Sequence, residues 1–173
     1  MVKFSIVVVA LNAEKYIRKT IESVLGQTYQ NFEVVVKDGL SKDNTLKEIP
    51  HDEHIRIYQE EDSSLYDAMN QATRYSTGDY VLYLNCGDVF ASNDVLEEVA
   101  KFLSEHTDCD LLYGDYSRGI FVSKQASSIT KFYLYRTPLC HQTIFFKTNL
   151  IKTRFQYDTS FRILADYNVE LGM

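Results

Sequence analysis

A set of polar side chains follows three separate apolar runs of the sequence. They are Asn12 after residues 5–10, Asp38 after residues 32–36, and Asn85 and Asp88 after residues 80–84. Carboxylate and amide oxygens suit Mg²⁺ or Mn²⁺, and such a cation needs only one or two protein carboxylates when substrate phosphates and water complete its shell. These residue types therefore permit a site for a divalent cation and a diphosphate without His or Cys ligands.

The three polar endings can form one site only if the apolar runs are neighbouring parallel strands. The runs are β-branched and nearly continuous, which is typical of strands buried on both faces. Residues 17–25 and 65–75 have helical spacing, and residues 55–58 alternate like a further strand. Alternating strands and helices predict βαβ units, hence a mostly parallel sheet between two helical layers. Ligands of such α/β sheets bind at the carboxyl ends of the strands.

Each polar ending also has a simpler interpretation. Asn and Asp commonly cap helices and close turns, and Asn12 is well placed as the N-cap of the first helix. For one residue alone, capping is the better explanation. Three such endings on one edge of a sheet favour a binding site.

The regular alternation of strands and helices does not continue through the second half of the chain. A helix is predicted over residues 93–105, followed by a hairpin of 110–114 with 119–122 that turns around Ser117 and Arg118. We expect a strand at 143–146 and a last helix from about Phe161. The length of 173 residues is that of one domain.

Composition excludes several classes of protein. The formal net charge of −6, without a basic run, argues against a nucleic-acid partner. Three cysteines without metal-ligand spacing fit a reducing cytosol, and the amino-terminal residues predict neither a signal peptide nor a spanning helix. There is no Gly-x-Gly-x-x-Gly after the first strand and no P-loop, which disfavours dinucleotide-dependent dehydrogenases and P-loop NTPases.

Several stretches, in order along nearly the whole chain, closely resemble the family-2 glycosyltransferases. They are SIVVVALN at 5–12, IESVLGQTY at 21–29, DGLSKDNT at 38–45, DSSLYDAMN at 62–70, the run from Gly78 to Asp88, His141-Gln142, and Ala165-Asp166-Tyr167. The resemblance implies an inverting enzyme with the GT-A fold, a Rossmann-like α/β three-layer sandwich. It implies one catalytic domain over 1–173, with a nucleotide-binding part at about 1–90 and an acceptor-side part at about 91–173. Family members usually continue further, so we expect a chain truncated at its carboxyl end.

The resemblance also implies roles for residues on the donor side. Ala10, Leu11 and Asn12 would lie against the nucleotide, and Asp38 would contact its base. Asp67 would lie by the donor, and Asn85 would donate or accept a hydrogen bond at the sugar or ribose. The chain departs from the family's pattern at three positions, with Leu11 where Tyr is common, Ser64 where Gly is usual and Gly87 where many members carry Asp.

Two further carboxylates are implied in the reaction itself. Asp88 would hold Mg²⁺ or Mn²⁺ across the donor diphosphate, and Asp166 would be the general base that takes the acceptor's proton. His141 is either a structural residue or a group that contacts the diphosphate or the acceptor.

The function implied is metal-dependent inverting transfer of a sugar from a nucleotide-diphospho-sugar to a glycan or lipid-linked glycan. The resemblance places it in surface polysaccharide synthesis, in the cytoplasm and peripherally at the inner face of the membrane. One alternative is a non-catalytic nucleotide-sugar-binding domain. Another is a nucleotidyltransferase, although the expected Gly-rich basic loop after the first strand is lacking.

Overall fold

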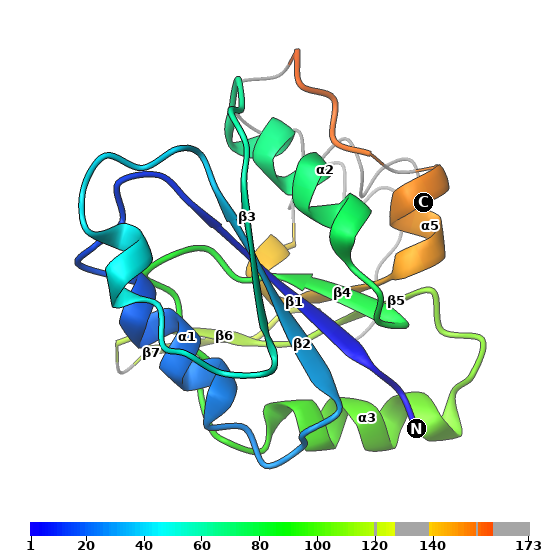
Figure 1. The fold of residues 1–173 in the computed structure, drawn as a ribbon. Coiled ribbons are helices and arrows are strands. Elements are labelled where there is room, and N and C mark those ends of the chain that lie inside the picture. Colours follow the sequence, from blue (N-terminus) through cyan, green and yellow to red (C-terminus); the bar gives the residue numbers. More distant parts are fainter. Residues whose placement is uncertain (120, 127–138, 155, 161–173) are drawn as a thin grey trace.

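A computed structural model of the chain describes residues 1–119, 121–126, 139–154 and 156–160. Its centre is a six-stranded sheet with the order β3-β2-β1-β4-β8-β5 (Figure 1). The strands are β1 (Phe4–Ala10), β2 (Phe32–Asp38), β3 (Ile55–Gln59), β4 (Tyr80–Tyr83), β5 (Leu111–Tyr113) and β8 (Ile144–Lys147). β1 is parallel to both β2 and β4, and β2 is parallel to β3, whereas β8 is antiparallel to β4 and β5. The mostly parallel α/β sheet is confirmed.

Helices cover both faces of this sheet. α1 (Ile17–Leu25) and α3 (Val95–Glu105) pack on one face, and α2 (Leu65–Tyr75) and α5 (Thr148–Thr153) pack on the other. Two short 3₁₀ helices, η1 (Thr45–Glu48) and η2 (His141–Thr143), lie in the connections. The expected three layers are therefore present.

The continuous apolar sequence of β1 explains why helices cover both faces of the sheet. Ile6 and Val8 belong to the core under α1 and α3, whereas Val7 and Val9 belong to the core under α2. Successive side chains of a strand point to opposite faces, so a continuous apolar run fills two cores. This arrangement places the carboxyl end of each parallel strand at one edge of the sheet.

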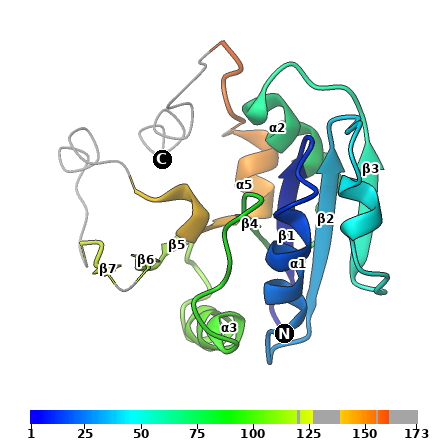
Figure 2. The same cartoon turned by 90° about the vertical axis from the view of Figure 1, so that its left-hand side faces the viewer.

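The structure corrects the predicted hairpin. Residues 111–113 are β5 and pair with β8 in the main sheet, while β6 (Tyr116–Arg118) pairs with β7 (Phe121–Ser123). This small hairpin lies off the main sheet on the side of β5 (Figure 2). Ser117 and Arg118 are strand residues, and the turn follows at Gly119, whose φ of 63° suits glycine. The error arose because an apolar run of three or four residues does not reveal its partner strand.

The prediction that Asn12 caps the first helix is also wrong. α1 begins at Ile17, and its N-cap position is Tyr16, which makes no side-chain cap hydrogen bond. Asn12 has a φ of 51°, a left-handed conformation that Asn tolerates better than most residues. It belongs to the loop after β1.

In the part of the chain that the structure describes, no helix combines the length and apolar character required to span a bilayer.

Candidate functional site

The loops that follow β1 and β2 are joined by hydrogen bonds at the carboxyl edge of the sheet. The Gly39 N–H donates to the Ala10 carbonyl at 2.8 Å, and the Asn12 N–H donates to Ser41 Oγ at 2.8 Å. The Asn12 side chain then accepts from the Lys42 N–H at 2.9 Å. The left-handed backbone of Asn12 thus allows its side chain and main chain to hold both loops together. Two of the predicted donor-side residues, Ala10 and Asn12, lie at this junction.

Asp38 closes β2 and is fully buried. Its carboxylate accepts from both the N–H, at 3.0 Å, and the hydroxyl of Ser41. It therefore stabilises the turn that carries Gly39, while its contact with a nucleotide base remains a prediction. Leu11, by contrast, is 58% exposed at the same edge.

The loop after β4 is anchored to α1 and leaves one carboxylate free. The Gly87 N–H donates to Thr20 Oγ1 at 2.8 Å, and the Asp88 N–H donates to the Asn85 carbonyl at 3.0 Å. Asp88 is exposed, and no described residue makes a hydrogen bond or an ion pair with its carboxylate. A free carboxylate in this position is suited to a ligand.

Cys86 lies in the loop after β4, and β4 is separated from β2 by β1. The pKa of its thiol is raised to about 12, first by burial and then by the negative charges of Asp38 and Asp88. Burial has the largest effect because it disfavours the charged thiolate, and the two carboxylates act in the same direction. Cys86 is therefore a protonated, partly buried side chain that packs against the core.

Asn85 forms a pair with His141 across the end of β4. Asn85 Nδ2 and His141 Nε2 are 3.1 Å apart, and the Asn85 Oδ1 atom is buried with no partner among the described residues. A buried polar atom without a partner costs roughly 1–3 kcal/mol, so a ligand hydroxyl at this position would be stabilising. The structure thus places His141 in the candidate site, beside Asn85.

Asp67 lies in the first turn of α2 and caps this helix together with its neighbours. Its carboxylate accepts from the N–H and the hydroxyl of Ser63, each at 2.9 Å, and its own N–H donates to Ser64 Oγ at 3.2 Å. The pKa of Asp67 is lowered, first of all by the Ser63 N–H. Ser64 has an extended backbone, with φ −169°, so a side chain fits where many family members carry Gly. A role of Asp67 at the donor remains a prediction.

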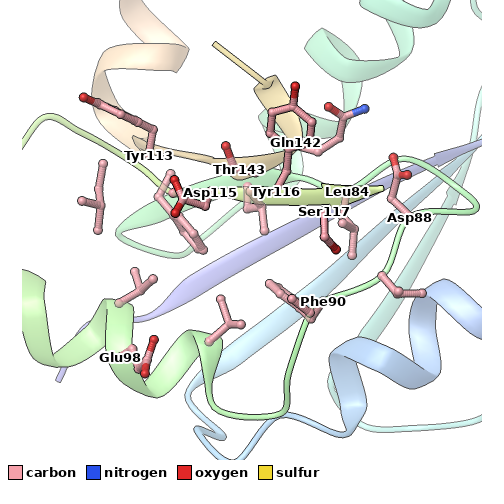
Figure 3. A pocket seen from close by; sticks show the side chains of 18 of the residues that line it. Leu84, Asp88, Phe90, Glu98, Tyr113, Asp115, Tyr116, Ser117, Gln142 and Thr143 are labelled. Atoms are coloured by element: carbon pink, nitrogen blue, oxygen red, sulfur yellow. The ribbon is translucent and has the colours of Figure 1, made fainter. Parts of the chain in front are cut away.

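A cleft of about 890 Å³ extends from Asp88 between α3 and the strands β5 and β6. Figure 3 shows Asp88 at one end and Tyr113 at the other, with Gln142 and Thr143 along the side of η2. Sequence reasoning did not single out Thr143, Asp115 or Tyr116, because the misplaced hairpin hid their common position. The cleft provides room for a ligand that reaches Asp88.

The residues present fit a cation that is shared with a diphosphate. Within the described ranges, no group of three or more His, Cys, Asp or Glu side chains is arranged to hold a metal ion. The free carboxylate of Asp88 is suited to the alternative, in which phosphates and water supply most of the ligands. Asp166, the predicted general base, lies outside the described residues.

Gly87 has a φ of 106°, and no atom lies within 4 Å of the position a Cβ would occupy there. The backbone conformation at position 87, and not a lack of room for a side chain, therefore favours glycine. We expect Gly87→Ala to lower the free energy of unfolding by about 1–3 kcal/mol, because an L-residue is strained in that conformation. Urea denaturation measures this, and Gly114→Ala, at a glycine with equal space and no positive φ, should change it by no more than about 0.5 kcal/mol. Equal effects of both substitutions would contradict the explanation.

The fold and the polar carboxyl edge of its sheet define a class of protein. A mostly parallel, doubly covered sheet with ligand groups at its carboxyl edge is the architecture of nucleotide-binding α/β proteins. Residues 5–161 match the family model "Glycosyl transferase family 2". The chain belongs to glycosyltransferase family 2, as its resemblance predicted, and the protein class is that of a glycosyltransferase.

Individual relatives agree with this assignment. The "PGL/p-HBAD biosynthesis glycosyltransferase" of Mycobacterium bovis is 33% identical over 175 residues, which cover 97% of this chain and 68% of that protein. S. aureus TarS in complex with UDP superposes with a TM-score of 0.80 at 24% identity, over 96% of this chain and 53% of the TarS chain. Mannosyltransferase PcManGT of Pyrobaculum calidifontis, in complex with GDP-Man and Mn²⁺, gives 0.76 at 20% identity, over 97% and 50%. Both structural likenesses support the GT-A fold, and this chain spans about half the length of those solved chains.

Proposed function

We propose that this chain transfers a sugar, with inversion, from a nucleotide-diphospho-sugar to a hydroxyl of a glycan or lipid-linked glycan. The observation that carries the proposal is the free carboxylate of Asp88, in the loop after β4 at the carboxyl edge of the parallel strands. Family membership supports a nucleotide-sugar donor, as do the structures of relatives that contain UDP or GDP-Man.

The proposed site residues have different roles in this reaction. Ala10, Leu11 and Asn12 bind the nucleotide with Asp38, and Asp88 binds Mg²⁺ or Mn²⁺ together with the diphosphate. The cation, when bound, supplies charge neutralisation for the departing nucleoside diphosphate. The bond from the acceptor oxygen to the anomeric carbon forms as the bond to the diphosphate oxygen breaks, and Asp166 takes the acceptor's proton.

Assembly of a surface polysaccharide or related glycan, at the cytoplasmic face of a membrane, is the setting we propose. The name of the mycobacterial relative supports a glycoconjugate product. A non-catalytic nucleotide-sugar binder is the remaining alternative, because Gly87 leaves Asp88 without an adjacent carboxylate. Family membership favours a glycosyltransferase over the nucleotidyltransferase alternative.

Calorimetric titration with UDP, GDP and dTDP, each with and without Mn²⁺, tests the donor site. We expect one nucleotide to bind, and Mn²⁺ to strengthen its binding by at least about tenfold, because the metal offsets repulsion between the diphosphate and Asp88. Binding of none of the three, in the presence of Mn²⁺, would contradict both the transferase and the binder. Binding without turnover of any nucleotide sugar would favour the binder.

A further inference from the structure

Lys37 is a fully buried lysine at the carboxyl edge of the sheet, one residue before Asp38. Its ammonium group donates to the Glu60 carbonyl at 2.7 Å and forms an ion pair with the Asp62 carboxylate. Lysine is almost never fully buried unless it is paired. Both partners of Lys37 come from the segment 60–64, which connects β3 to α2.

The segment 60–64 is held against the end of β2 by more than this ion pair. The Glu60 N–H donates to the Asp38 carbonyl at 3.1 Å. At Gly39, a Cβ would lie 2.7 Å from Asp62 Oδ2, which is closer than such atoms approach. A side chain at position 39 would therefore force the Asp62 carboxylate to shift from its place beside Lys37.

The same segment leads directly to Asp67. Ser63 follows Asp62 and donates two hydrogen bonds to the Asp67 carboxylate. The pKa of Asp67 is lowered chiefly by these hydrogen bonds, with the positive charge of Lys37 as a smaller contribution. Lys37 is therefore paired with Asp62, and its positive charge also acts on Asp67 at the start of α2.

Stability alone does not explain a buried ion pair at this place. Removing two charges from water is costly, and apolar residues of similar volume often replace such a pair with no loss of stability. Apolar residues would not reproduce the contacts of the Lys37 ammonium group with the Glu60 carbonyl and the Asp62 carboxylate. That contact sets where the segment 60–64 lies relative to the loop after β2.

We propose that Lys37 is a positioning residue for the nucleotide-sugar donor, which holds the segment 60–64 and Asp67 in place beside Asp38. Lys37 does not touch the donor; it acts through the segment that it anchors. The proposal rests on the proposed function, because it assumes that the donor binds at this edge.

The test compares donor binding with stability in variants of the whole chain. Affinity is measured by calorimetry, with Mn²⁺ and whichever of UDP, GDP and dTDP the unaltered protein binds. Lys37→Met should weaken binding at least tenfold and lower the melting temperature, since it leaves the partly buried carboxylate of Asp62 without its partner. The double variant Lys37→Met/Asp62→Asn removes both charges, and should recover most of the melting temperature while binding stays at least tenfold weaker.

Glu33→Gln is the matched control. Glu33 is a buried carboxylate on the same strand but at the opposite edge, within 4.0 Å of Lys3 and Arg56 and hydrogen-bonded to Ser5 and Thr77. The Glu33→Gln variant should have a lower melting temperature and an unchanged donor affinity. Recovery of both stability and affinity in the double variant, or equal weakening of binding in Glu33→Gln, would overturn the proposal. If the unaltered protein binds no nucleotide, it is the proposed function that fails.

Discussion

Replacing Asp88 with Asn is expected to remove the effect of Mn²⁺ on donor binding and to lower sugar transfer by roughly 10²–10³-fold, the range typical for the loss of one group that stabilises developing charge. The carboxylate is exposed and free of described partners, so the substitution breaks no internal contact. Asn keeps the shape and one oxygen but removes the negative charge that would hold a divalent cation. Calorimetry with and without Mn²⁺, together with a transfer assay, measures both effects.

Glu98→Gln is the control for that experiment. Glu98 is an exposed carboxylate of α3 that lines the same cleft, in the first turn of a helix and away from the strand ends. Its removal should leave the Mn²⁺ effect intact. If Asp88→Asn retained the full Mn²⁺ effect, Asp88 would not be the metal ligand.

Asp166→Asn is expected to spare donor binding and to reduce transfer by roughly 10²–10⁴-fold, the usual contribution of a general base. An inverting displacement requires the acceptor hydroxyl to lose its proton, and an amide cannot accept it. The donor is bound before this step by other residues, so its dissociation constant should remain within about twofold of the original, a change well below 1 kcal/mol. A donor titration and a single-turnover transfer assay separate the two quantities.

Asp158→Asn serves as the neighbouring control. Asp158 is exposed, and its carboxylate accepts a hydrogen bond from the Ser160 N–H at 2.9 Å, so it caps a local turn. Its loss should leave transfer unchanged. Undiminished transfer by Asp166→Asn would remove Asp166 as the base, and a parallel loss of donor binding would indicate a different role.

β1 and β2 were predictable because each has seven residues that are buried on both faces of the sheet. A run such as 5–10 fills two cores, and no amphipathic alternative competes with that interpretation. The later strands have three or four residues each, and β5 pairs with β8 more than thirty residues away. Local pattern carries no information about such a partner, which is why the hairpin was misplaced.

The candidate site was predictable to the extent that strand ends define it. Parallel strands present their carboxyl ends at one edge, and Asp38 at the end of β2 and Asp88 in the loop after β4 follow that rule, while their shared role at a ligand stays a prediction. The anchoring of loops was not visible, because the bond from Gly87 to Thr20 and the pair of Asn85 with His141 join residues more than fifty positions apart. Lys37 was missed for a related reason: its burial depends on Asp62, which belongs to another loop.

The strand order has a consequence for the sequence of events in folding. β4 pairs with β1 on one side and with β8 on the other, and β8 follows it in the chain by some sixty residues. A chain leaving the ribosome therefore presents β4 as an open edge, able to pair with other molecules, until residues 144–147 have emerged. A fragment that ended near residue 90 would keep that edge permanently, so it should aggregate and not behave as an independent nucleotide-binding module. The loop that carries Asp88 also gains its contact between Asn85 and His141 only when this later part of the chain is in place.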